Sequence, residues 1–250
     1  MNNPKKFPKE KFRRGIFILP NIFTTLNMFF GFFGIINTLN GKYTMAAYAI
    51  IIAGVFDLLD GKIARATNTT SKFGIEYDSL ADLLSFGLAP ALLMYSWSLM
   101  SLGRIGWLAA FLFVVCGALR LARFNTQVGT IDSGLFMGLP IPGGAGMCAT
   151  TVLFCHRIGV GETVNPFIIL VLLYGLSFLM VSTVRFNSFK QPELFNKIKF
   201  NVFVLTVLIL IFIAAEPAIT LFLMGSVYTI SGPFNYLRSI RKERPVDVDS

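Results

Sequence analysis

Charged residues are scarce in this sequence. Asp, Glu, Lys and Arg make up 14% of its 250 residues, whereas apolar residues make up 54%. A soluble domain usually carries about 25% charged residues, and the mean hydropathy of this chain is +0.68. Phe occurs 26 times, which suits a surface in contact with lipid better than a compact core in water. The composition therefore excludes an ordinary soluble enzyme and predicts an all-α, polytopic integral membrane protein, built as a helical bundle.

Cysteine and histidine are also rare, with three Cys and one His. All three cysteines fall in apolar segments, so we expect small apolar packing groups rather than a disulfide framework or a metal-binding set. The net charge is +9, but the basic residues lie at the ends of apolar segments. This distribution is typical of membrane anchoring, and we expect no nucleic-acid partner.

The apolar residues form about eight candidate membrane spans. Their expected bounds are 16–39, 43–66, 76–102, 105–123, 142–158, 164–184, 200–214 and 217–234. The fifth and the last two are short for a span of about 20 residues, so we expect tilted or partly re-entrant helices there. The expected organisation is a basic interfacial segment over 1–15, a transmembrane domain over 16–234 and a charged cytosolic tail over 235–250.

The distribution of Lys and Arg predicts the orientation of these spans. With both termini in the cytosol, Lys42, Arg104 and Arg157 are the only ones of the 22 basic residues on the opposite side. Because positive residues accumulate on the cytosolic side, this asymmetry favours a multi-pass protein of the cytoplasmic membrane with both ends in the cytosol.

A group of acidic residues interrupts the second and third apolar segments. It reads Asp57-x2-Asp60-Gly61-x2-Ala64-Arg65-x8-Gly74-x3-Asp78-x3-Asp82. Residues 57 to 65 of the pattern share one helical face, and Asp78 and Asp82 are one turn apart on the next helix. Burying an unpaired carboxylate in a membrane costs several kcal/mol. Two facing helices with pairs of oxygen ligands predict a site for two divalent cations, Mg²⁺ or Mn²⁺.

The residues around the acids favour a diphosphate ligand. Gly61 and Ala64 keep one face of the helix open, and Arg65 provides a fork suited to phosphate. Asp82 is placed to act as a general base toward an attacking hydroxyl group. The alternative is a set of buried ion pairs with the basic residues Lys62, Arg65 and Lys72. Ion pairs, however, do not require Gly and Ala at fixed positions.

This pattern resembles the signature of the CDP-alcohol phosphotransferases at every fixed position. The resemblance implies a six-helix core and an enzyme that uses two divalent metals to displace CMP from a CDP-linked lipid. It implies metal binding by Asp57, Asp60, Asp78 and Asp82, with Asp82 also the base. The CDP-diacylglycerol-binding residues implied are Gly61, Ala64, Arg65, Ser71, Gly74, Asn21 and Thr24. For Asn21 and Thr24, the alternative is that they cap the start of a helix.

Three further segments resemble the branch of the family whose acceptor is serine. They are 20–27, 118–125 and 138–142. In the first, relatives that use glycerol phosphate commonly carry Arg at the position of Asn27. The implied reaction transfers the phosphatidyl group of CDP-diacylglycerol to the hydroxyl of L-serine, giving phosphatidylserine and CMP.

A serine site needs a cation for the carboxylate of the amino acid. Arg120 and Arg123 are three residues apart on one helical face at the cytosolic side, and Arg185 lies at another cytosolic span end. The alternative for Arg120 and Arg123 is anchoring at lipid headgroups. Because Pro140 and Pro142 disfavour a regular helix, the segment 138–146 is expected to form a re-entrant loop over this site, or else a flexible connection.

Two other functions remain open at this stage. One is a member of the same family with another acceptor, such as glycerol 3-phosphate or inositol phosphate. The other is an ion-coupled transporter, although the sequence lacks the internal repeats and distributed acids common in transporters. The family resemblance also suggests a homodimer surrounded by membrane lipids.

Overall fold

The structure is a computed structural model that describes residues 9–67, 71–127, 138–184 and 200–243. The regular structure of these residues is entirely helical. The helices are α1 (Lys9–Leu39), α2 (Tyr43–Thr67), α3 (Lys72–Asp82), α4 (Ala89–Trp97), α5 (Arg104–Gln127), α6 (Ile141–Arg157), α7 (Pro166–Val181), α8 (Phe200–Ala215) and α9 (Pro217–Glu243). A π-helical segment (Leu83–Leu88) joins α3 to α4 without a break, and a short 3₁₀ helix (Leu99–Leu102) precedes α5. The all-α prediction is confirmed for the described residues.

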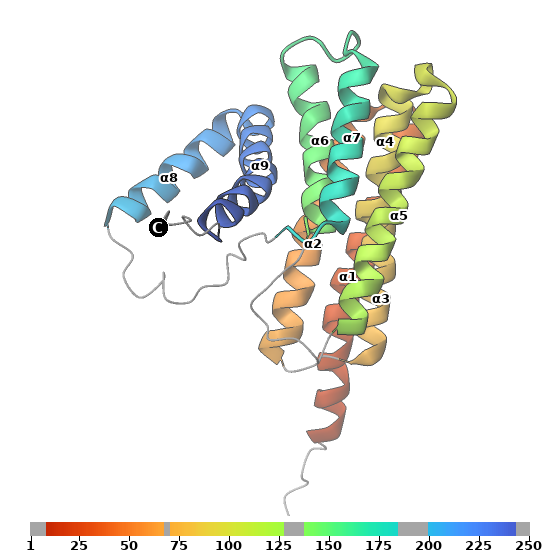
Figure 1. The fold of residues 1–250 in the computed structure, drawn as a ribbon. Coiled ribbons are helices and arrows are strands. Elements are labelled where there is room, and N and C mark those ends of the chain that lie inside the picture. The colour runs from red at the N-terminus through yellow and green to blue at the C-terminus, as the bar shows by residue number, and fades with distance from the viewer. Residues whose placement is uncertain (1–8, 68–70, 128–137, 185–199, 244–250) are drawn as a thin grey trace, which may run out of the picture.

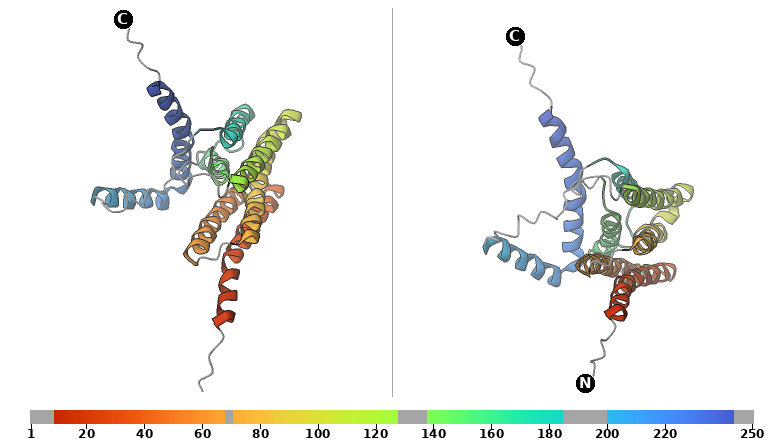
Figure 2. Two further views of the ribbon diagram at one scale, coloured as in Figure 1. Left: turned by 60° about the horizontal axis from the view of Figure 1, so that its bottom comes forward. Right: turned by 90° about the horizontal axis from the view of Figure 1, so that it is seen from below.

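The helices α1 to α7 form one bundle (Figure 1). The closest pairing is between α1 and α2, and the rod from α3 to α4 packs against both α1 and α5. Helix α9 packs against α6, while α8 packs against α9. Figure 2 shows α8 and the far end of α9 extending away from the bundle. The acidic segment therefore lies where α1, α2 and the α3–α4 rod meet.

Five helices are long and apolar enough to cross a membrane among the described residues. Their spans are Leu19–Leu39, Tyr43–Thr67, Lys72–Trp97, Arg104–Thr126 and Pro217–Tyr236. Two shorter apolar helices cover Pro166–Val181 and Thr206–Ala215. The chain is therefore a polytopic helical membrane protein. Every one of the eight expected spans coincides with a helix or, for 76–102, with the α3–α4 rod and the 3₁₀ turn.

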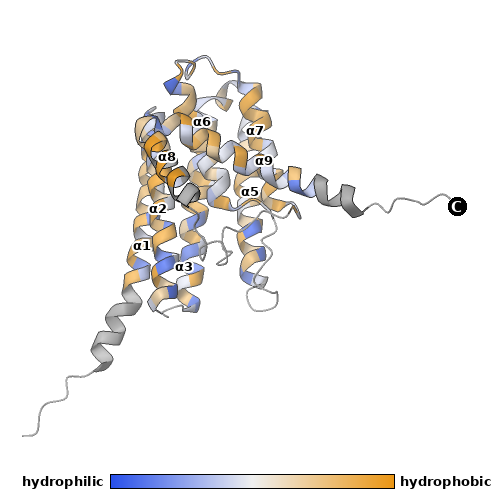
Figure 3. Cartoon of the chain, turned by 90° about the vertical axis from the view of Figure 1, so that its left-hand side faces the viewer, coloured by the Kyte–Doolittle hydropathy of each residue, from blue (hydrophilic) through white to orange (hydrophobic). Residues whose placement is uncertain are grey.

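The core of the bundle uses small residues where helices approach and large ones between them. On α2 the buried face is mostly alanine, and a Cβ at Gly34 of α1 would lie 3.4 Å from the carbonyl oxygen of Ala46. Phe86, Leu93 and Phe113 are fully buried, with Phe86 beside Gly54 of α2 and Phe113 beside Gly144 of α6. Many other phenylalanines point outward, including Phe29, at 57% exposure. This agrees with a lipid-facing surface, and Figure 3 shows hydrophobic residues over most of the bundle, with hydrophilic ones toward its lower end.

Two expectations about local structure are wrong. The segment 138–146 is not a loop, because α6 begins at Ile141 and Pro142 occupies its first turn, where a proline costs no hydrogen bond. The short connection before it is fixed, since the N–H groups of Gly138 and Leu139 bond to the carbonyl oxygens of Val184 and Leu179 at 2.9 Å.

The alternative that Asn21 and Thr24 cap a helix start also fails. Helix α1 begins at Lys9 and contains Pro20 inside it, so both residues lie in its interior.

Candidate active site

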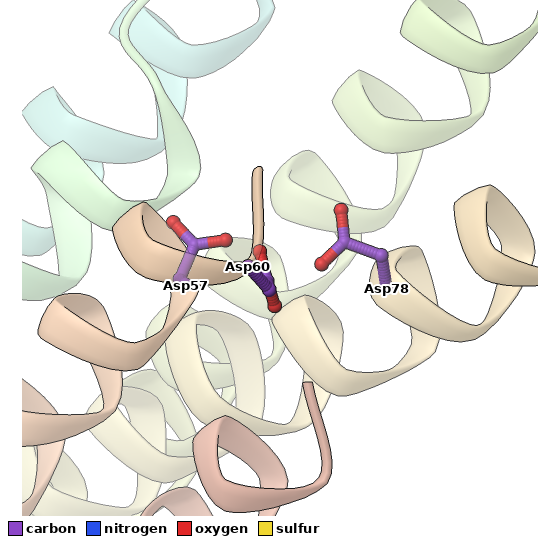
Figure 4. Close-up of side chains that lie close together, drawn as sticks. All are labelled: Asp57, Asp60 and Asp78. Carbon is purple, nitrogen blue, oxygen red and sulfur yellow. The ribbon is translucent and has the colours of Figure 1, made fainter. Parts of the chain in front are cut away.

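Three of the four expected aspartates converge. Asp57 and Asp60 extend from α2 and Asp78 from α3, and Figure 4 shows their carboxyl groups pointing toward a shared space. One oxygen from each residue lies within 4.8 Å of the others. Asp60 is buried, and the other two are half-buried. The helical spacing brings the carboxyl groups together as expected, since residues three apart share a face of α2.

Asp82 lies one helical turn beyond Asp78, at the buried side of this group. Its side chain is 8% exposed, and it lies near the carboxyl group of Asp57. Asn27 of α1 donates from Nδ2 to Oδ1 of Asp82 at 3.1 Å. Asp82 is not among the three mutually close donors, so it adjoins the group from the interior.

Thr24 supports the acidic group from α1. Its hydroxyl lies 2.9 Å from Oδ2 of Asp60 and 3.1 Å from the carbonyl oxygen of Pro20. The residue is 3% exposed. This contact orients Asp60, because a buried hydroxyl beside a carboxylate donates to it. The structure thus connects Thr24 to a proposed metal ligand.

No salt bridge to these acids is found within the described part of the chain. The one salt bridge found there joins Arg157 to Glu216, far from this site. Lys62, Arg65 and Lys72 are exposed. The alternative of buried ion pairs is therefore wrong for these residues.

One oxygen of the group lacks any protein donor. Oδ1 of Asp78 is buried and has no hydrogen-bond partner among the described residues. Closely spaced carboxylates without cationic side chains need a bound cation or protons to be stable away from water. Hard oxygen donors in this arrangement fit Mg²⁺ or Mn²⁺. The residues present therefore fit the divalent metal that the sequence pattern predicts.

The expected nucleotide-side residues flank the acids in two places. Gly61, Ala64 and Arg65 continue the face of α2, and a Cβ at Gly61 would meet only the Arg65 guanidinium, at 3.8 Å. This face is open to a ligand beside the carboxyl groups.

The second place is the N-terminus of α3. Ser71 caps this helix by accepting a hydrogen bond from the N–H of Gly74 at 3.0 Å. A Cβ at Gly74 would lie 3.1 Å from Oγ of Ser71 and 3.6 Å from Oδ1 of Asn21. The tight contact of such a Cβ would be with Ser71, whereas its distance to Asn21 is an ordinary van der Waals contact. The structure thus brings Asn21 of α1 next to Ser71 and Gly74 at the start of α3, although they are about fifty residues away in sequence.

On the acceptor side, the expected arginines differ in their surroundings. Arg120 of α5 is half-buried in the neighbourhood of Tyr228 of α9 and of Asp82, and its Nε has no hydrogen-bond partner among the described residues. Arg123 is exposed. Arg185 lies outside the described residues. Of these arginines, the structure therefore connects Arg120 to the acidic group.

Four residues of this region were not predicted as site residues from the sequence. Asn27 and Ser85 are fully buried polar residues, and Gly31 lies against Ser85. A polar residue inside an apolar run was the available signal for the first two. Tyr228 of α9 carried no such signal, because a tyrosine near the end of a span is commonly an interfacial anchor.

Comparison with known proteins identifies the family. The sequence model of the CDP-alcohol phosphatidyltransferases matches residues 17–174, which include all four aspartates. The chain belongs to the CDP-alcohol phosphatidyltransferase family. The matched region runs from α1 into α7, so α8 and α9, with Tyr228, lie beyond it.

Several relatives carry the same specific name, CDP-diacylglycerol–serine O-phosphatidyltransferase. The protein of Helicobacter pylori is 39% identical over 89% of this chain and 92% of its own length. The protein of Methanocaldococcus jannaschii is 37% identical over 90% of this chain and 97% of its own. The protein of Bacillus subtilis is 42% identical over 58% of this chain and 77% of its own. The first two similarities each cover about nine tenths of this chain.

Proposed function

We propose that this chain is a CDP-diacylglycerol–serine O-phosphatidyltransferase. It transfers the phosphatidyl group of CDP-diacylglycerol to the hydroxyl group of L-serine and releases CMP. The observation that carries the proposal is the convergence of Asp57, Asp60 and Asp78 with no salt bridge to them among the described residues. The names of the relatives that match about 90% of the chain support serine as the acceptor.

The acidic group is the proposed metal site. Asp57, Asp60 and Asp78, together with Asp82, hold two divalent ions, Mg²⁺ or Mn²⁺. When bound, these ions neutralise the diphosphate and stabilise the charge on the leaving CMP. Thr24 keeps Asp60 in its orientation through the 2.9 Å contact. Gly61, Ala64 and Arg65 accept the diphosphate on the open face of α2, and Asn21, Ser71 and Gly74 bound the nucleotide from the start of α3.

Asp82 is the proposed general base. Its carboxylate takes the proton of the serine hydroxyl, and the serine oxygen then attacks the phosphorus that bears diacylglycerol. A new P–O bond forms to serine as the P–O bond to CMP breaks. Burial of Asp82 excludes water, which would otherwise compete with serine and hydrolyse the lipid.

Arg120 is the proposed partner of the serine carboxylate. Its Nε lacks a partner among the described residues, and it lies in the neighbourhood of Asp82. A cation at this place pairs with the acid of serine while the hydroxyl faces the base. Arg123, which is exposed, and Arg185 are weaker candidates for the same role.

The arrangement in the membrane is also a proposal. The distribution of Lys and Arg places the acidic group and both termini on the cytosolic side of the cytoplasmic membrane. We propose eight membrane-crossing segments around a six-helix core, and a homodimer on the basis of family resemblance alone. Cysteine labelling from either side of sealed vesicles tests the orientation, and mass measurement in detergent tests the dimer.

The test of the acceptor uses the purified full chain in detergent with CDP-diacylglycerol and Mn²⁺ or Mg²⁺. Serine, glycerol 3-phosphate and inositol phosphate are added separately, and CMP release and the lipid product are measured. The proposal predicts phosphatidylserine with serine and no new lipid with the other two. A product with a phosphorylated acceptor instead would reject serine but retain the metal site. An ion transporter would neither release CMP nor bind it with the metal.

A further inference from the structure

Asn27 is a fully buried amide on α1 that faces the acidic group. Its side chain is 0% exposed, and its Nδ2 donates to Oδ1 of Asp82 at 3.1 Å. Since a carboxylate oxygen only accepts, the nitrogen of the amide must be the atom that faces Asp82. The hydrogen bond therefore occupies one of the two oxygens of Asp82.

The backbone of Asn27 is held to the same rod that carries Asp82. The hydroxyl of Ser85, three residues beyond Asp82, donates to the carbonyl oxygen of Asn27 at 3.0 Å. Gly31, one turn beyond Asn27 on α1, allows this approach because a Cβ there would lie 2.2 Å from Oγ of Ser85. Asp82 and Asn27 are thus connected both through their side chains and through Ser85. The π-helical segment that begins at Leu83 supplies Ser85, and such segments are frequent at functional sites.

The amide of Asn27 is only partly satisfied at this position. Its Oδ1 is buried and has no hydrogen-bond donor among the described residues. A buried polar atom without a partner is costly, and leucine would avoid that cost, but it would leave Oδ1 of Asp82 without the N–H that it accepts. The contribution of the amide is therefore its hydrogen bond to Asp82.

We propose that Asn27 is a positioning residue for Asp82. This proposal rests on the proposed role of Asp82 as the base. The N–H of Asn27 fixes the rotation of the carboxyl group, so that Oδ1 is occupied and Oδ2 is the oxygen that receives the proton of the acceptor hydroxyl. Asn27 acts on the transfer step and makes no contribution to the binding of CMP.

The test replaces Asn27 by Leu in the purified full chain. Steady-state kinetics with CDP-diacylglycerol and serine, CMP binding with Mn²⁺, and thermal unfolding are measured for the variant and the wild type. We expect kcat to fall about 10–100-fold, as for other residues that orient a catalytic ligand. We expect KM values and CMP affinity to change by less than about 3-fold, because the Asn27 side chain bonds to Asp82 and not to the three converging carboxyl groups of Asp57, Asp60 and Asp78. The Tm should change little, because leucine removes the unpaired amide oxygen but also the donor to Asp82.

Two further variants complete the test. Asn37→Leu is the matched control, because Asn37 is also a buried amide on α1. Among the described residues, its side chain bonds only to the carbonyl oxygen of Phe33, at 2.8 Å. This variant should keep the kcat of the wild type. Asn27→Asp keeps the shape, removes the N–H and adds a carboxyl group that repels Asp82, so it should lose kcat even if Asn27→Leu folds poorly.

Two results would overturn the role of Asn27. The first is a kcat of Asn27→Leu within about 3-fold of the wild type, and the second is a loss of CMP binding equal to the loss of kcat, which indicates a structural role. A wild-type enzyme that uses another acceptor rejects the proposed function separately, and the same kcat comparison with that acceptor still tests Asn27.

Discussion

Gly31 is the position where a single added methyl group should disturb the catalytic geometry most directly. A Cβ on Gly31 would lie 2.2 Å from Oγ of Ser85 and 2.7 Å from its Cα. Carbon atoms pack at about 3.5–4.0 Å, so α1 and the α3–α4 rod would have to separate by about 1 Å. Because the second contact is to backbone, rotation of the Ser85 side chain cannot relieve the clash. Overpacking of this kind costs about 1–3 kcal/mol.

The same displacement reaches Asp82. Asn27 and Asp82 lie on the two elements that Gly31→Ala forces apart, and their 3.1 Å hydrogen bond has little slack. A misplacement of about 1 Å in a catalytic group costs about 100-fold in rate. We therefore expect Gly31→Ala to lower both the Tm and kcat, the latter about 100-fold. The assays are thermal unfolding in detergent and phosphatidyl transfer from CDP-diacylglycerol to serine.

Two comparisons make this prediction specific. Gly146→Ala and Gly175→Ala are controls within α6 and α7, since a Cβ at either position would meet nothing within 4 Å, and alanine favours a helix. Both should keep normal turnover. The double variant Gly31→Ala/Ser85→Ala should not recover, because Cα and Cβ of Ser85 also lie at 2.7 Å. Wild-type stability and turnover in Gly31→Ala would refute the close approach described here.

Two further predictions concern interactions at either end of the bundle. Thr24→Val removes the hydroxyl 2.9 Å from Asp60 at nearly constant volume, so the Mn²⁺ concentration for half-maximal turnover should rise about 10–100-fold; an unchanged Mn²⁺ dependence would separate Thr24 from the metal site. Arg157 at the end of α6 donates from Nε to Glu216 at 2.8 Å, and this bond lowers the pKa of Glu216 below its ordinary value. The stabilisation is therefore present at pH values above the pKa of Glu216 in the unfolded protein, and it is lost as the pH falls through its pKa in the folded protein. The Tm difference between the wild type and Glu216→Gln should thus vanish in acid. A difference that persists in acid would contradict a stabilising bond between Arg157 and ionised Glu216.

The sequence predicted the helices well because their signals are local. Apolar runs place each span within a few residues, and the spacing of Asp57, Asp60 and Asp78 places their side chains on faces that meet. Proline misled the prediction at Pro142, since the same residue that breaks a helix interior also opens a helix. The difference depends on position in the turn, which composition does not reveal.

Contacts between helices were the part that the sequence could not predict. Periodicity defines the face of one helix but does not identify the neighbour of that face. Asn27 and Gly31 of α1 contact Ser85 of the rod, which lies more than fifty residues later in the sequence. Tyr228 reaches the neighbourhood of Arg120 only because α9 packs against α6. These residues became site residues through tertiary packing.

The aspartates of α2 and α3 are proposed to hold the divalent ions on which phosphatidyl transfer depends. The most direct test measures bound Mn²⁺ and CMP release with serine in the same samples of wild type, Asp78→Asn and the control Glu76→Gln, whose carboxylate is exposed on the same helix. The wild type and the control should bind about two Mn²⁺ per chain and release CMP. Asp78→Asn should bind fewer ions, and its turnover should fall at least about 100-fold, because the metal no longer stabilises the charge on the leaving group. Full Mn²⁺ binding and normal turnover in Asp78→Asn would contradict the account.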